Sequence, residues 1–133
     1  MSLLDLIFGT KHKKKERHVE RRDVNLSQTV VDGTTAVLFQ FQVPSKAILV
    51  LKKFANYTDI VGAWGTLTWR ILKNGIGVYP YDDIEDEIGY SAMPENITNI
   101  EFRGGDLCVI NAENLSGADL IMGIRLVYEL VGY

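Results

Sequence analysis

Between residues 24 and 133 apolar and polar side chains alternate, and this alternation limits the possible folds more than any other feature of the chain. In TLTWRIL, residues 66–72, every second side chain is apolar: Leu67, Trp69 and Ile71. A period of two is typical of a half-buried β-strand. No stretch keeps an apolar repeat of 3.6 residues over three turns. The pattern therefore predicts an all-β domain.

We expect seven or eight short antiparallel strands separated by turn dipeptides. The strongest hairpin signal is Lys73-Asn74-Gly75-Ile76, because Asn and Gly tolerate the positive φ of a type I′ turn. Gly123 lies inside the last expected strand and predicts a bend or bulge there. The expected strands are 24–31, 37–43, 46–54, 66–72, 97–102, 106–112 and 119–130, with a short strand at 76–79.

This many strands predicts two sheets packed face to face, since a single sheet would leave one apolar face in water. An immunoglobulin-type sandwich usually carries two cysteines around a tryptophan, whereas this chain has only Cys108. Two long connections, roughly 55–65 and 80–96, favour an antiparallel jelly roll. Cys108 lies in the apolar run LCVI, which indicates a buried structural thiol.

The charge of the 133-residue chain is divided unevenly. Residues 1–25 hold seven Lys/Arg and four Asp/Glu, a net of +3, whereas residues 26–133 hold seven and thirteen, a net of −6. We therefore predict a basic N-terminal arm, residues 1–25, and a jelly-roll domain, residues 26–133. The arm begins with LLDLIF, which is too short for a membrane span, and its charges follow the apolar run, unlike those of a secretory signal.

An apolar segment on a charged tether indicates an anchor that docks in a groove of another chain or adds to its sheet edge. Because opposite charges steer association and fix its register, we expect the arm to meet the acidic segment 82–87 of a neighbouring subunit. The residues expected to contact a partner are Leu3, Leu4, Leu6, Ile7, Phe8, Lys11, Lys13, Lys14, Lys15, Arg17, Arg21, Arg22, Asp82, Asp83, Glu85, Asp86 and Glu87.

Two alternatives for the arm stay open. The first alternative to the anchor is a disordered, solubilising tail. The second is a contact for nucleic acid, in which each neutralised phosphate releases a counterion. Nucleic acid is not favoured, because Glu16 and Glu20 lie within the arm and the body is acidic.

The sequence offers little for catalysis. Its only histidines, His12 and His18, lie in the arm, so the body has no histidine for a cupin-type metal site or for a Ser-His-Asp or Cys-His nucleophile. A carboxylate pair for glycoside hydrolysis is the remaining alternative. Segment 82–87 could supply oxygen ligands to Ca²⁺, but it lacks the spacing of an EF-hand, which favours a solvated loop. We expect no enzymatic activity, no metal and no cofactor.

Four aromatic residues give an alternative function, in which a carbohydrate- or receptor-binding β-sandwich stacks rings on sugar faces. Trp69 belongs to an alternating strand and is expected in the core, whereas Trp64, in GAWG, is a candidate for an exposed ring. The candidate ligand-binding residues are Trp64, Tyr79, Tyr81 and Tyr90.

From VVDGTTAVLFQFQVPSKAILVLKKFANYTD through LTWRILKNG to NIEFRGGDLCVINAENLSGADLIMGIRLVYEL, the body resembles the small single-jelly-roll structural proteins of viruses. It is most similar to capsid decoration (cement) or minor capsid proteins of tailed bacteriophages. The resemblance rests on strand rhythm, on VPSKAILVLKKFANYT and on the NLSGAD turn before the last strand, without a binding motif. It implies a virion protein made in the host cytoplasm that forms a homo-oligomer, with a trimer favoured, and is tied by its arm to the major capsid protein or another virion protein.

Overall fold

The computed structural model of the chain describes residues 17–60 and 63–132, except for the side chains of residues 98 and 99. Within these residues eight strands form. They are β1 (His18–Val30), β2 (Thr34–Gln42), β3 (Ala47–Thr58), β4 (Leu67–Lys73), β5 (Ile76–Gly77), β6 (Glu95–Arg103), β7 (Leu107–Asn114) and β8 (Leu120–Gly132). The described part of the chain contains no helix that could cross a membrane.

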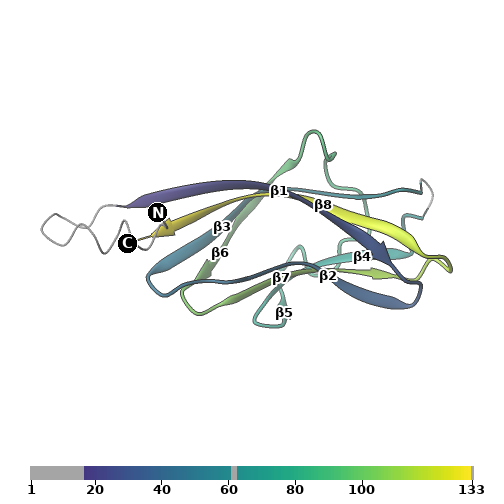
Figure 1. Cartoon of the computed structure of the whole chain (residues 1–133), viewed down its shortest axis with the longest axis horizontal. Coiled ribbons are helices and arrows are strands. Elements are labelled where there is room, and N and C mark those ends of the chain that lie inside the picture. Colours follow the sequence, from purple (N-terminus) through teal and green to yellow (C-terminus); the bar gives the residue numbers. More distant parts are fainter. Residues whose placement is uncertain (1–16, 61–62, 133) are drawn as a thin grey trace, which may run out of the picture.

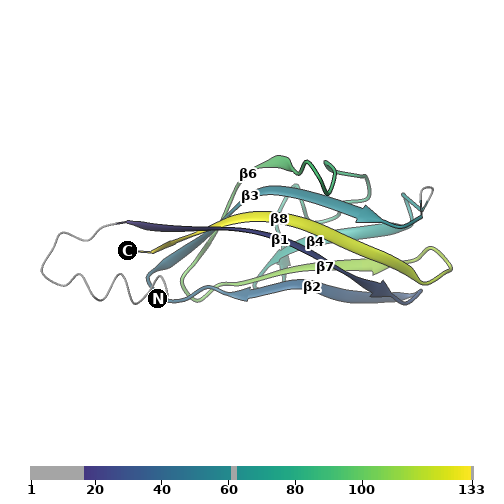
Figure 2. The ribbon, with the colours of Figure 1, turned by 45° about the horizontal axis from the view of Figure 1, so that its top comes forward.

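The strands form two four-stranded antiparallel sheets that lie face to face (Figures 1 and 2). Sheet A has the order β1-β8-β3-β6 and sheet B the order β2-β7-β4-β5. The chain passes from one sheet to the other at every connection except the β4–β5 hairpin. This is the eight-stranded jelly-roll arrangement, so the predicted fold class is confirmed.

The core lies between the inner faces of the two sheets. Phe54 of sheet A and Trp69 of sheet B are both fully buried, as predicted for Trp69. Burial of a side chain of this size contributes roughly 1.5–3 kcal/mol. Cys108 is also fully buried, as its apolar surroundings predicted, and it is the only cysteine of the chain. The domain therefore depends on packing and not on an internal disulfide.

Most strand predictions agree with the structure to within a few residues. The β4–β5 hairpin turns at Asn74 and Gly75, whose φ angles of 52° and 84° suit the predicted type I′ turn. The long connection between β5 and β6 is also present. The other predicted connection is shorter than expected, because β3 continues to Thr58.

The predicted boundary between arm and domain at residue 25 is wrong, because β1 begins at His18 and not at residue 24. Residues 18–25 pair with β8, from His18 opposite Gly132 to Asn25 opposite Arg125. The first half of β1 is an edge strand with charged side chains, and charged side chains are common on edges because they discourage further pairing. Its polar composition conceals it in the sequence.

The bulge predicted at Gly123 is also wrong. The pairing of β8 with β1 runs without a shift through Gly123. The bulges lie instead in β2, between Val37 and Phe39, and in β3, between Leu51 and Lys53. The bulge in β2 places both Leu38 and Phe39 in the core.

Candidate functional site

The connection between β5 and β6 closes one open side of the sandwich. Its first part lies against β4: Val78 N donates to Ile71 O at 2.9 Å, and Ile71 N donates to Tyr81 O at 2.9 Å. Ile84 then pairs with Trp69 through two backbone hydrogen bonds. The connection therefore extends sheet B beyond β4.

The second part of the same connection lies against sheet A. The buried side chain of Asn56, in β3, donates from Nδ2 to Asp86 O at 3.1 Å and accepts a hydrogen bond from Ile88 N at 2.6 Å. Asn56 N also donates to Ile88 O. The acidic segment 82–87 is thus a wall that joins the two sheets, and most of its side chains are exposed.

The carboxylates of this wall differ in their surroundings. Asp83 accepts a hydrogen bond from Arg70 at 2.8 Å, and Arg70 also contacts Glu113 at 3.2 Å. Glu85, Asp86 and Glu87 are exposed and form no ion pair with any residue of ranges 17–60 and 63–132. In these ranges no group of three or more His, Cys, Asp or Glu side chains is arranged to hold a metal ion.

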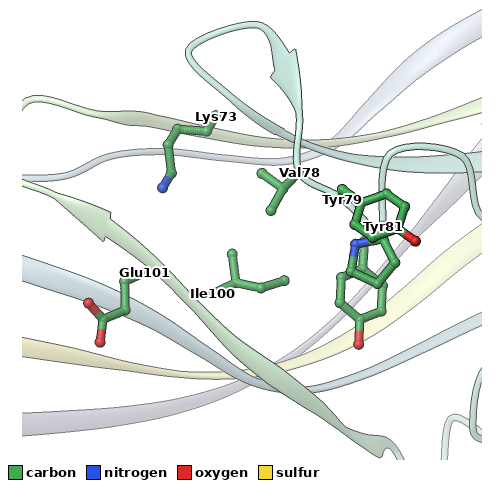
Figure 3. Close-up of a pocket in the computed structure, with 7 residues that line it drawn as sticks. Lys73, Val78, Tyr79, Tyr81, Ile100 and Glu101 are labelled. Atoms are coloured by element: carbon green, nitrogen blue, oxygen red, sulfur yellow. The ribbon is translucent and has the colours of Figure 1, made fainter.

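A pocket of about 210 Å³ opens beside the wall, between β6 of sheet A and the turn that follows β5. We call it the side pocket. In Figure 3 Val78 and Ile100 lie at its centre, Lys73 and Glu101 at one end and the rings of Tyr79 and Tyr81 at the other. The residues that line it are Lys73, Val78, Tyr79, Pro80, Tyr81, Ile100 and Glu101.

The four predicted ligand-binding aromatics do not form one site. Tyr79 and Tyr81 line the side pocket, and Tyr79 is 86% exposed. Tyr90 is 66% exposed but lies outside that pocket, where its backbone pairs with Met93. Trp64 is half-buried and stacks on Trp69 with ring centroids 5.3 Å apart, so its ring completes the core. Only two of the four aromatics are placed to share a ligand.

Sequence reasoning missed Lys73, Ile100 and Glu101 as pocket residues. Lys73 ends β4, whereas the other two lie on β6, a strand of the opposite sheet. No motif links these positions along the chain. The jelly-roll strand order, which brings the β5 and β6 edges to the same side of the sandwich, is the signal that would have found them.

We call the end of the domain where β1 begins, at His18, the chain entry. The opposite end forms a second feature, which we call the tip: residues 31–33, 59–60, 63–66 and 115–119. The buried side chain of Asn114 joins its connections by donating to Val30 O at 2.8 Å and to Ala118 O at 2.7 Å. Val31, Ile60 and Leu115 are exposed there. A hollow of about 260 Å³ between the connections is lined by Ile60, Ala63, Thr66, Ser116, Ala118 and Leu120.

Most predicted partner-binding residues of the arm, together with His12, lie outside the described residues: Leu3, Leu4, Leu6, Ile7, Phe8, Lys11, Lys13, Lys14 and Lys15. Arg17 is exposed just before β1. Arg21 and Arg22 belong to β1, where Arg22 lies 3.2 Å from Glu20 and Arg21 4.0 Å from Glu129 of β8. Both are therefore paired within the domain.

Comparison with known proteins places the chain in no family. No protein-family model and no curated protein matches it. Among solved structures it is similar to a chain of the Bacillus endospore appendages, a family of disulfide-linked pili, with a TM-score of 0.44, 11% identity and coverage of 88% of this chain and 89% of that one. It is also similar to a family 35 carbohydrate-binding module from Clostridium thermocellum, with a TM-score of 0.35, 15% identity and coverage of 87% and 97%. Similarities at this level identify no function.

Proposed function

We propose that the chain is a virion structural protein, a capsid decoration (cement) or minor capsid component, that catalyses no reaction. The observation that supports this proposal best is the separation of the chain entry from the tip. β1 enters the domain beside the last residues of β8, with His18 opposite Gly132, and the tip lies at the other end of both strands (Figure 1). One end carries the anchor and the other is available for contact.

In this proposal the arm, now limited to the residues before β1, ties the domain to the major capsid protein or another virion protein. The tip supplies contacts between copies, because Val31 and Leu115 are exposed there on connections that the hydrogen bonds of Asn114 join. Closed symmetry, with a trimer favoured, would let each copy use the same surface. A stable contact of this kind buries more than about 1,000 Å² in total. The protein would be made in the host cytoplasm and reside in the virion.

The test compares the full chain with a variant that lacks residues 1–16. A deletion of residues 1–25 would be uninformative, because it would also remove the first half of β1. We expect the full chain to co-sediment with shells of the major capsid protein, and the deletion variant to stay folded but remain in the supernatant. Equal co-sedimentation of the two, or none by either, would refute the anchoring role.

Light scattering after size-exclusion chromatography tests the role of the tip. We expect a trimer or larger species, and a shift towards monomer in the double variant V31K/L115K. V37K is the matched control, since Val37 is equally exposed but lies on β2 away from the tip. A full chain that is monomeric at all concentrations would contradict the oligomeric part of the proposal.

A further inference from the structure

The side pocket joins an apolar centre to two polar ends. Its centre is apolar, from Val78 and Ile100, and its two ends differ in chemistry. Tyr79 and Tyr81 present aromatic rings with polar tips at one end, and Lys73 and Glu101 present a donor and an acceptor of hydrogen bonds at the other. At about 210 Å³ it is smaller than the roughly 300–1,000 Å³ of pockets for drug-sized ligands. It therefore suits one small ring.

The charges of Lys73 and Glu101 limit the chemical class of a ring that could bind in the pocket. A free anion would meet the carboxylate of Glu101, and a cation would meet the ammonium of Lys73, so neither sign of net charge is favoured. A neutral group with many hydroxyls suits both, because a hydroxyl accepts from an ammonium and donates to a carboxylate. A pyranose also has an apolar C–H face that can lie on an aromatic ring.

The pocket is held in place before any ligand arrives. Tyr81 N donates to Val78 O at 2.7 Å, and both residues are bonded to Ile71 of β4, which fixes the turn that carries the two tyrosines. The ammonium of Lys73 lies 5.2 Å from the centre of the Phe102 ring. Glu101 lies 3.5 Å from Arg103. Such preorganisation reduces the entropy lost on binding.

We propose that the side pocket binds one neutral pyranose unit of a glycan, with the tyrosine rings against its C–H face and its hydroxyls between Lys73 and Glu101. The site lies within one subunit, so it does not depend on the proposed role in a virion. For a single sugar in so small a pocket we expect a Kd on the order of 1 mM. Display on an oligomer would raise the apparent affinity by about 10²–10⁴-fold.

The experiment is an NMR titration of the full ¹⁵N-labelled chain. The probes are glucose, galactose, mannose and N-acetylglucosamine, each also as a short oligosaccharide, at concentrations on the order of 20 mM. We expect at least one sugar to shift the amide resonances of Tyr79, Tyr81, Ile100 and Glu101 together. If no sugar shifts them, or if the shifts map to the tip, the proposal is overturned.

Variants decide whether the contacts are the ones proposed. Y79A should weaken binding because it removes the apolar ring surface that meets the C–H face of the sugar. K73M should weaken binding about tenfold or more, because it removes a charged donor that a sugar hydroxyl accepts from. Y90A is the matched control for the ring, since Tyr90 is exposed outside the pocket, and K52M is the control for the lysine.

Two substitutions in the pocket are at exposed side chains, so loss of binding in them can be distinguished from unfolding. Tyr79 is largely exposed, so Y79A should melt at the temperature of the wild type, and E101Q offers a second exposed change in the pocket. Loss of binding in Y90A equal to that in Y79A would refute the assignment of the site. Unchanged binding in both Y79A and E101Q would do the same.

Discussion

Gly123 leaves space on sheet A for the ring of Tyr57. The two residues are direct partners in β8 and β3, and the hydroxyl of Tyr57 donates to Asn25 Oδ1 in β1. Tyr57 therefore reaches across β8 at Gly123, a position that has no side chain. A methyl group at Gly123 would overlap the tyrosine ring. The glycine is required by the close approach of the Tyr57 ring.

The variant G123A should lower the free energy of unfolding by about 1–3 kcal/mol, because the ring must move and lose its bond to Asn25. Chemical denaturation measures the change. In the Y57A background the same substitution should cost much less, since the added methyl then meets no ring. Equal costs in both backgrounds would show that Tyr57 is not the cause.

Cys108 has a second residue-level consequence. Its side chain is fully buried, and burial raises the pKa of the thiol to about 12. Since the thiolate is the reactive form, a disulfide reagent at pH 8 should react at least about 100-fold more slowly with the native chain than with the chain in denaturant. Absorbance of the released thiol follows both rates. Rapid labelling of the native chain would contradict the packing around β7.

At the level of the elements, the sequence predicted the strands whose apolar residues alternate. It missed the part of β1 that is held by side chains of a distant strand. β7 buries every second side chain, and in β4 the alternating Leu67, Trp69 and Ile71 are all buried, so apolar residues mark both strands clearly. The first half of β1 has few apolar residues, because its charged side chains find partners on β8 such as Glu129 and Arg125. Those partners are about a hundred positions away, where a local pattern cannot show them.

The pairing of Asp23 in β1 with Arg125 in β8 makes part of the stability depend on pH. Two hydrogen bonds of 3.0 and 2.8 Å join the side chains, and the hydrogen bond from Arg125 is the main cause that lowers the pKa of Asp23. A lowered pKa in the folded state gives stability above the unfolded pKa of about 4, and this stability is lost as the pH falls through the lower, folded value.

We therefore expect D23N to be less stable than the wild type at pH 7 and the difference to shrink as the pH falls below about 4. Urea denaturation at a series of pH values measures it. E87Q is the control, because Glu87 is exposed and forms no ion pair among the residues described. A difference that is constant down to pH 2 would show that Asp23 does not act through its charge.

Asn114 at the end of β7 joins the end of β1 to the connection between β7 and β8. Its amide donates to Val30 and Ala118, and its oxygen accepts from Ser116 N at 2.9 Å. N114A would leave the buried Val30 O and two partly buried backbone groups without this partner, so we expect a loss of about 2–4 kcal/mol. Thermal unfolding measures the loss. The exposed Asn96 provides the control N96A, and an equal, small effect of both variants would refute the role of Asn114.

At the level of the whole molecule, charge of one sign is concentrated in two places, the acidic wall and the basic arm. Glu85, Asp86 and Glu87 project from a wall that hydrogen bonds hold to both sheets, so they form a fixed acidic surface. If the arm of a neighbouring copy meets this surface, salt and charge reversal should both weaken self-association, because ions screen exposed charges beyond about 8 Å at physiological ionic strength.

The variant E85K/D86K/E87K should therefore show a higher dissociation constant for self-association than the wild type, and its dependence on salt should be smaller. Sedimentation at about 50 and 500 mM NaCl measures both effects. E95K, on β6 outside the wall, is the control. Self-association of the wild type that does not change with salt would contradict the contact between arm and wall.

The side pocket could be anticipated only in part. Tyr79 and Tyr81 lie two positions apart in the sequence, and their aromatic side chains indicated a place for a ligand. Ile100 and Glu101 line the pocket from the other sheet. Trp64 does not line it, because its ring stacks on Trp69 at the core. Both outcomes depend on how the sheets stack, which alternation along one strand does not encode.

The position of β8 also has a consequence for how the chain is made. β8 lies between β1 and β3, so sheet A lacks an inner strand until residues 120–132 have left the ribosome. β1 can pair with β8 only after the other strands of the domain have been synthesised. A nascent chain that stops before β8 cannot bury the apolar face of β3, so it stays open to proteases and chaperones.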